Sequence, residues 1–241
     1  MKQEIIPIDL EGVNCYLGKS EEGFVLFDTG GHLIMDKSFT NRREELTGRL
    51  EELGIRSGNL KAIILTHGDS DHAANAAFLR EKYKSMIAIH RDDLELVNEV
   101  TLNKMMESFR YRSVIYKAIF GLLKNKIEAM TQKVLNDFEQ FKPDVFLKEG
   151  DDLSAYGFSG KVLHLPGHTP GSIGILSEQG ELVAGDIFTN VKKPALAPNA
   201  ADFRRLEESA ARLYSMKITR VYPGHGRPFE VSQEGLVKQL R

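Results

Sequence analysis

Four potential metal ligands fall within six residues, and this cluster constrains the chain more than any other feature. Segment 65–72 reads Leu-Thr-His-Gly-Asp-Ser-Asp-His. Its first residue is the last residue of an apolar run at 62–65. Its candidate ligands are His67, Asp69, Asp71 and His72. Zinc, iron and manganese all accept imidazole and carboxylate ligands. Because a strand end followed by a tight polar loop can aim several side chains at one point, the segment predicts a metal site.

Composition is that of an ordinary globular protein. The 241 residues, 41% hydrophobic and 27% charged, suffice for one large domain with a buried core. The formal net charge of −2 argues against a nucleic-acid partner. The single Cys15 cannot form an internal disulfide, which is typical of a reducing cytosol. No stretch approaches the roughly 20 apolar residues of a membrane span, so we expect a cytoplasmic protein without stable membrane insertion.

Apolar runs and turn residues predict two series of strands and helices. The first series has strands at residues 4–8, 13–17, 24–27, 61–65 and 86–89 and helices at 39–53 and 71–83. The second has strands at 145–147, 161–165, 173–176, 181–184 and 219–222 and helices at 202–216 and 233–240. This repetition predicts two similar halves that share one core.

The region between the two series, residues 91–142, has a helical pattern throughout and is nearly free of glycine and proline. Its apolar residues on one helical face are Tyr111, Ile115, Ala118, Ile119 and Leu122. We expect a helical insertion packed on the domain, with its lysines and arginines in solvent. The alternatives are a lid over an active site and a homodimer contact.

Three later segments are each expected to present one more candidate ligand at a turn. These ligands are His168, Asp186 and His225, and a glycine directly precedes each of them. Glycine tolerates unusual backbone angles and so suits a sharp turn that presents a side chain. Taken alone, any of the seven residues could merely cap a turn or helix, as Asp71 could at a helix N-terminus. Their number and order favour a metal site.

The ordered set of motifs resembles the metallo-β-lactamase-fold superfamily. It consists of Asp-Thr-Gly at 28–30, the cluster at 67–72, Gly-His-Thr-Pro-Gly-Ser at 167–172, Gly-Asp at 185–186 and Pro-Gly-His-Gly at 223–226. The resemblance implies an α/β (α+β) fold, a four-layer αββα sandwich with the metals at one edge of the two sheets. Residues 1–241 would form a single domain with a helical insertion at about 91–142, and Asp28 would support the site by hydrogen bonding.

The resemblance also implies the ligand set and the reaction. One metal would be held by His67, Asp69 and His168, the other by Asp71, His72 and His225, with Asp186 bridging the two. Two such ions yield hydroxide near neutral pH, and Asp71 would orient this bridging hydroxide or move its proton. The expected substrate is a small ester, thioester or lactone, and the core is similar to that of glyoxalase II, a thioester hydrolase.

Asp69 departs from the family, which most often has histidine at this position. A carboxylate makes the ligand set harder, so zinc is the first expectation and iron or manganese are the alternatives. Flavodiiron proteins also have a carboxylate there and perform redox chemistry with iron. The alternatives to ester, thioester or lactone hydrolysis are therefore a diiron redox enzyme, a phosphodiesterase and a binding module without catalysis.

Several residues outside the motifs have weaker claims to a function. We expect structural roles for His32, His90 and His164, and Cys15 is expected to be a small buried hydrophobe. Lys192 and Lys193 could meet an anionic substrate, although solvated surface lysines are the first expectation. Residues 194–198 and the insertion are candidate pocket walls, and apolar walls would suit a small-molecule substrate with an acyl or aromatic part.

Overall fold

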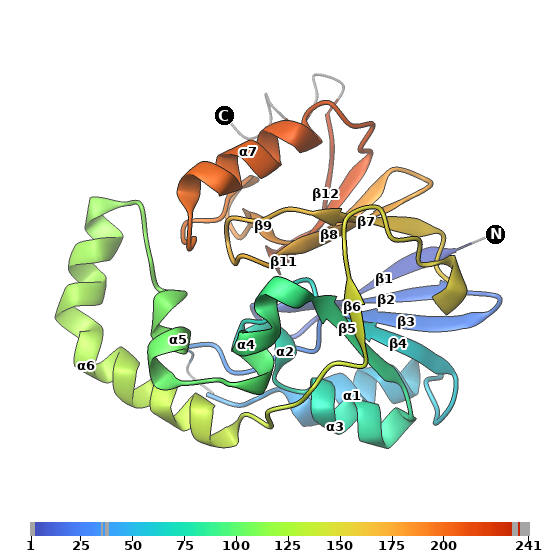
Figure 1. Ribbon diagram of the computed structural model, residues 1–241, viewed down its shortest axis with the longest axis horizontal. Helices are drawn as coiled ribbons and strands as arrows, with labels where there is room; N and C mark the ends of the chain where they lie inside the picture. The colour runs from blue at the N-terminus through green and yellow to red at the C-terminus, as the bar shows by residue number, and fades with distance from the viewer. Residues whose placement is uncertain (1–2, 35, 37–38, 233–235, 237–241) are drawn as a thin grey trace.

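Two six-stranded sheets form the framework of the protein, whose computed structural model describes residues 3–34, 36, 39–232 and 236. The first sheet has the order β1-β2-β3-β4-β5-β6, and the second has the order β12-β11-β9-β8-β7 with β10 paired to β9. The sheets lie face to face, with α1 and α3 on the outer side of the first and α7 on that of the second (Figure 1). This is the predicted four-layer αββα arrangement.

The first sheet is built from the N-terminal series of strands. They are β1 Glu4–Asp9, β2 Asn14–Ser20, β3 Gly23–Phe27, β4 Leu60–Ile64, β5 Met86–His90 and β6 Val145–Leu147. The first three strands pair antiparallel, and β3 to β6 pair parallel. Parallel strands are covered on both faces and therefore appear as continuous apolar runs, which is why the sequence located β4 and β5 to within one residue.

The second sheet contains two strands that are longer than the sequence predicted. Its strands are β7 Gly160–His164, β8 Ile173–Ser177, β9 Glu181–Asn190, β10 Ala195–Leu196, β11 Arg220–Gly226 and β12 Phe229–Glu230. Parallel pairing of β9 with β11 continues to Asn190 and Gly226, with register shifts on both sides of Pro223. The prediction that Asp186 and His225 lie in turns is therefore wrong, since both lie within strands.

Alternation along the strands divides the apolar residues between three packed layers. On β3, Val25 and Phe27 face the second sheet, whereas Leu26 packs toward α1 and α3. Phe27 makes an edge-to-face contact with Phe158 between the sheets, at 5.0 Å between ring centroids. On the far side, Leu206 and neighbouring apolar residues of α7 pack on the second sheet. The two series of elements thus share one central layer, as predicted.

The outer helices are α1 Arg43–Glu52, α3 Ala76–Tyr83 and α7 Phe203–Leu213, with a short 3-10 helix, η2, at Ser154–Tyr156. The helix predicted from residue 39 begins later because Arg42 has a left-handed backbone, with φ of 58°. The buried guanidinium of Arg42 donates hydrogen bonds to the carbonyl oxygens of Leu10 and Gly31. The helix predicted at 233–240 lies outside the described residues, apart from residue 236.

The helix predicted at residues 71–83 is in fact two, α2 Ser70–Ala73 and α3. Asn75, at the break, is buried, and its amide donates to the carbonyl oxygens of Thr29 at 2.9 Å and Asn41 at 2.8 Å. These hydrogen bonds fix Asn75 in a position that interrupts the helix between α2 and α3. The consequence is a short helix, α2, attached directly to the predicted ligand loop.

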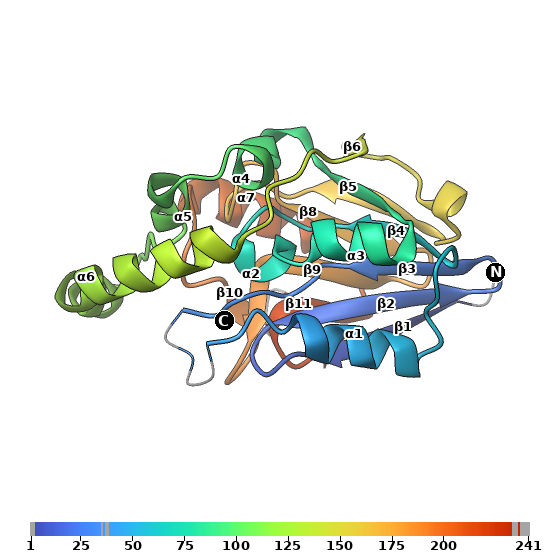
Figure 2. The ribbon, with the colours of Figure 1, turned by 90° about the horizontal axis from the view of Figure 1, so that it is seen from below.

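The insertion contains η1 Arg91–Asp93, α4 Leu94–Asn98, α5 Leu102–Glu107 and α6 Val114–Asp137. It lies at one side of the sandwich, and α6 reaches beyond it (Figures 1 and 2). The prediction that the face with Ile115 and Leu122 packs on the domain is wrong, because their exposed fractions are 70% and 86%. The buried residues of α6 are Ile127, Thr131 and Val134. None of the helices in the described part of the chain is long and apolar enough to cross a membrane.

Candidate metal centre

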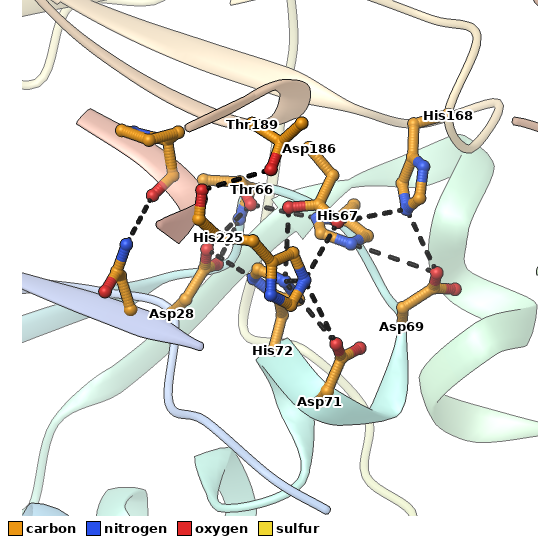
Figure 3. A network of polar contacts seen from close by, with 12 residues as sticks. Asp28, Thr66, His67, Asp69, Asp71, His72, His168, Asp186, Thr189 and His225 are labelled. Carbon is orange, nitrogen blue, oxygen red and sulfur yellow. Dashed lines mark hydrogen bonds and ion pairs between the residues drawn. The ribbon is translucent and has the colours of Figure 1, made fainter. Parts of the chain in front are cut away.

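Seven predicted ligands converge from four separate segments of the chain (Figure 3). His67 and Asp69 lie in the loop after β4, Asp71 and His72 in α2, His168 between β7 and β8, Asp186 in β9 and His225 in β11. His67, His72, His168 and Asp186 are buried, and the other three are partly exposed. The cluster therefore has an inner, desolvated side and an outer side that solvent reaches.

The first group of ligand atoms consists of His67, Asp69 and His168, which lie within 4.8 Å of one another. Asp69 Oδ2 is 3.9 Å from His67 Nε2 and 3.2 Å from His168 Nε2. Asp69 immediately precedes α2 but makes no side-chain capping bond to it. The carboxylate of Asp69 therefore contacts the other ligands and does not cap α2, which argues against a merely capping role for this residue.

The second group consists of Asp71, His72 and His225, also within 4.8 Å. Asp71 Oδ2 lies 3.3 Å from His225 Nε2 and 3.9 Å from His72 Nε2. The two imidazole Nε2 atoms are 3.5 Å apart. Asp71 lies inside α2 and not before it, so it is not the N-cap residue of that helix.

Asp186 lies between the two groups. Its Oδ2 is 3.6 Å from His168 Nε2 in the first group and 3.2 Å from His225 Nε2 in the second. Its Oδ1 is 3.4 Å from His72 Nε2. A carboxylate that reaches both groups has the position that a bridging ligand requires.

Hydrogen bonds on the outer nitrogens orient two of the imidazoles. His72 Nδ1 donates to Asp28 Oδ2 at 2.9 Å, and both side chains are buried. The Thr66 hydroxyl donates to the same carboxylate at 2.8 Å, so its oxygen is left to accept from His67 Nδ1 at 3.0 Å. Both rings therefore turn Nε2 toward the cluster, a common arrangement in proteins that bind metals through histidine.

Backbone carbonyls orient the other two imidazoles in the same way. His168 Nδ1 donates to the Asn199 carbonyl at 3.1 Å, and His225 Nδ1 donates to the Gly12 carbonyl at 2.6 Å. A carbonyl can only accept, so in each case the proton is on Nδ1. All four histidines thus present Nε2 to the interior of the cluster.

Two polar atoms at the centre test whether this set fits metal ions. His67 Nε2 and Asp186 Oδ1 are buried and have no hydrogen-bond partner among the described residues. Buried polar atoms are normally paired, and an unpaired one carries a desolvation cost. Imidazole nitrogen with carboxylate oxygen is a donor set that zinc, iron and manganese accept. The residues therefore fit a site for divalent metals.

Charge within the cluster divides the histidines into two kinds. Burial, followed by the neighbouring His72 and His168, lowers the pKa of His67 well below its usual value. Burial also opposes the charged form of His72, but Asp186, Asp28 and Asp71 outweigh it and raise its pKa to about 9. The pKa of His168 is likewise about 9, because Asp69 and Asp186 outweigh burial. Protons and metal ions therefore compete for the same nitrogens.

Glycines bring the strands close enough for the cluster to form. A β-carbon on Gly224, directly before His225, would collide with Asp186 Oδ1 and lie 2.6 Å from His72 Cε1. Gly185, before Asp186, has a φ of 52°, in the left-handed region that favours glycine. The glycines that the sequence associated with turns thus allow close approach of two strands.

Asp93 is a supporting residue that no pattern in the sequence singled out. Its buried carboxylate accepts from Gly68 N at 2.9 Å, Gly171 N at 2.6 Å and Thr169 Oγ1 at 2.7 Å. It therefore ties the loop of His67 and Asp69 to the loop of His168. The only signal in the sequence is an acidic residue after a buried strand, which is too common to be informative.

Residues outside the motifs lie apart from the cluster or serve other contacts. His90 and His164 have nearly parallel rings, 4.0 Å apart and inclined by 13°. Together with Asp92 they could hold an ion by distance, but parallel rings cannot both direct a nitrogen in-plane at one ion.

His32 is hydrogen-bonded to Asp137 at 2.9 Å. Lys192 and Lys193 are exposed, and Cys15 is buried with a pKa raised by burial.

Comparison with known proteins identifies a sequence family over most of the chain. The family described as the metallo-beta-lactamase superfamily matches residues 8–225. A hydroxyacylglutathione hydrolase, GloC, of Haemophilus influenzae is 30% identical over 192 residues, covering 78% of this chain and 72% of the relative. A probable metallo-hydrolase of Bacillus subtilis, YqjP, is 22% identical over 251 residues, covering 97% and 73%.

Solved structures share the fold. A metallo-beta-lactamase family protein from Thermus thermophilus, TTHA1429, superimposes with a TM-score of 0.64 at 23% identity, covering 95% of this chain and 74% of that one. The protein TTHA1623, whose crystal structure is of a di-iron-bound form, gives a TM-score of 0.61 at 26% identity and covers 94% of both chains. Both similarities extend over nearly the whole of this chain.

Proposed function

Because the chain belongs to the metallo-beta-lactamase superfamily, we propose that it is a dinuclear metal-dependent hydrolase of small esters, thioesters or lactones. Relatives that hydrolyse a thioester, such as the hydroxyacylglutathione hydrolase of Haemophilus influenzae, support hydrolysis as the reaction. The observation that carries the proposal is the convergence of four Nε2 atoms and three carboxylates at one point.

The ligand assignment follows the two groups of atoms. His67, Asp69 and His168 would hold one ion, Asp71, His72 and His225 the other, and Asp186 both. Divalent ions supply Lewis acidity, which activates water and stabilises negative charge on the substrate oxygen. The hydrogen bonds on the four Nδ1 atoms fix the rings before any ion binds, so that little reorganisation is needed.

We assign Asp71 a second role in moving the proton of the attacking water. Its carboxylate lines the cavity beside the cluster, and its side chain is partly exposed. The pKa of Asp71 is held below its usual range, since His72 and His225 outweigh the effect of burial. Asp71 therefore remains ionised near neutral pH and can accept a hydrogen bond from water that enters the cavity.

Zinc is the metal we propose first, with iron or manganese as alternatives. The carboxylate of Asp69, 3.2 Å from His168 Nε2, makes the first group harder than three histidines would be. This carboxylate also favours a second candidate function, a diiron redox enzyme, since the similar protein TTHA1623 has a di-iron-bound form. The redox candidate predicts bound iron after anaerobic preparation and reaction with oxygen, peroxide or nitric oxide.

Replacement of single ligands tests the proposal. His72→Ala and Asp186→Ala should each abolish metal binding and turnover of a panel of thioesters, esters and lactones. His164→Ala is a matched control, because His164 lies outside the cluster and should leave both unchanged. Full activity in either ligand variant would refute the assignment. Oxidase or peroxidase activity without hydrolysis would favour the redox candidate.

A further inference from the structure

A cavity of about 300 Å3 opens beside the cluster. The ligands on one wall are Asp69, Asp71, His168, Asp186 and His225. This volume lies at the lower end of the range for small-molecule sites. A substrate bound in the cavity would have its reacting group at the cluster and the rest of the molecule against the other walls.

Those other walls are largely apolar, and the insertion supplies much of them. Its apolar lining residues are Leu96, Val100, Met105, Phe109 and Val134. Leu33, Ile34, Phe188, Val191, Ala197 and Pro198 complete the apolar lining from outside the insertion. Phe109 lies between α5 and α6 and stacks on Phe120, with ring centroids 5.8 Å apart. The insertion thus forms an apolar wall facing the cluster.

No lysine or arginine lines this cavity among the described residues. The titratable acids and bases on its walls are the carboxylates and histidines of the cluster, together with His32 and Tyr111. The exposed Lys192 and Lys193 are not among the lining residues. The remaining polar side chains, such as those of Ser108 and Thr131, are neutral.

A glutathione thioester is poorly matched to such a cavity. Its peptide part carries two carboxylates, and burying an unpaired carboxylate against apolar walls has a large desolvation cost. The substrate named for the Haemophilus influenzae relative therefore requires cationic groups that this cavity lacks among its described residues.

We propose, on the premise of the hydrolase function above, that the substrate is a neutral ester, thioester or lactone with an apolar acyl part. The acyl part packs against the insertion, with Phe109 and Leu96 as principal contacts, and the carbonyl lies at the cluster. Hydrolysis adds water across the acyl bond and gives a carboxylic acid with an alcohol or thiol. Specificity then comes from apolar burial and from the lack of a lysine or arginine among the described lining residues.

Turnover of matched thioesters by the metal-loaded protein is the first test. Along the series acetyl, butanoyl and hexanoyl N-acetylcysteamine, kcat/KM should rise about fourfold per buried methylene group, as its transfer free energy implies. S-Lactoylglutathione should have a kcat/KM at least about tenfold below that of the hexanoyl compound. Equal values along the series, or preference for the glutathione thioester, would overturn the substrate proposal.

Binding of two thioethers separates this proposal from the hydrolase function. S-Hexyl-N-acetylcysteamine and S-hexylglutathione share the hexyl chain and cannot be hydrolysed, so calorimetry measures recognition alone. The neutral compound should bind at least about tenfold more tightly; equal or weaker binding overturns the proposal. If the neutral compound binds tightly but no thioester, ester or lactone is cleaved, the hydrolase function fails while the recognition chemistry stands.

Variants of the apolar wall locate the acyl site. Phe109→Ala and Leu96→Ala should each weaken binding of the hexyl thioether about tenfold and flatten the chain-length dependence. Ile115→Ala is the matched control, because Ile115 is exposed on α6 and is not among the lining residues. Two well-folded wall variants, judged by circular dichroism, that keep the wild-type chain-length dependence would overturn the assignment of this wall.

Discussion

Asp28 Oδ2 and His72 Nδ1 are hydrogen-bonded at 2.9 Å, and both side chains are buried. The same carboxylate accepts hydrogen bonds from the backbone N and the hydroxyl of Thr66. Asp28 itself has a φ of 60°, so the backbone is held in the left-handed region to place this carboxylate. One residue, outside the predicted ligand set, therefore orients His72 directly and His67 through Thr66.

Asp28→Asn should lower metal affinity about ten- to hundredfold, the usual effect of losing a carboxylate that orients a histidine ligand. The amide cannot accept from all three donors, so His72 loses its fixed orientation. Competition with a chelator measures the affinity. Asp144→Asn is the control, since that carboxylate accepts from Ile87 N far from the cluster. Unchanged affinity in Asp28→Asn would contradict the orienting role.

Asp93→Ala should lower the free energy of unfolding of the metal-free protein by about 2–4 kcal/mol. The reason is that two buried backbone N–H groups, of Gly68 and Gly171, lose their acceptor. Urea denaturation measures the change, and the neighbouring exposed Asp92→Ala should stay within about 0.5 kcal/mol of wild type. A loss as small as that of the control would mean that Asp93 does not tie the two loops.

Gly224→Ala should abolish metal binding, because its β-carbon would displace Asp186 and His72. Gly121→Ala is the matched substitution, since a β-carbon there, on α6, meets nothing within 4 Å. That control should bind metal normally and gain up to about 1 kcal/mol from helix propensity. Elemental analysis of both variants compares them. Normal metal content in Gly224→Ala would show that the strands can separate without losing the site.

Metal uptake near neutral pH should release about three protons per chain, one each from His72, His168 and His225. The pKa is raised to about 9 for His72 and His168 and is well above its usual value for His225, where Asp186 and Asp71 outweigh burial. Apparent affinity should therefore rise with pH from neutral through about 9, the range in which His72 and His168 lose their protons. Calorimetry in buffers of different ionisation enthalpy measures the release; affinity independent of pH would contradict it.

The sequence predicted the fold well because the order of its strands and helices depends on local patterns. The apolar runs identified β4 and β5, and short motifs identified His67, His168 and Asp186 without knowledge of their spatial neighbours. Whether these residues ligate metal remains a prediction. So do the cytoplasmic location, the single-domain organisation and a homodimer through the insertion.

The errors arose where distant contacts decide local structure. Asn75 interrupts the predicted helix by bonding to Thr29 and Asn41, residues that helical periodicity does not include. The sequence did not predict the role of Asp93, because its hydrogen-bond partners come from two loops far apart in sequence. The apolar face with Ile115 and Leu122 indicated a packed helix, yet that half of α6 projects beyond the sandwich.

The metal content of the purified protein, measured by elemental mass spectrometry after both aerobic and anaerobic preparation, tests the central claim most directly. The account predicts about two divalent ions per chain, with zinc or iron deciding between the hydrolase and the redox candidate. Little or no metal in either preparation would contradict the account. The convergence of the seven side chains would then have no catalytic meaning.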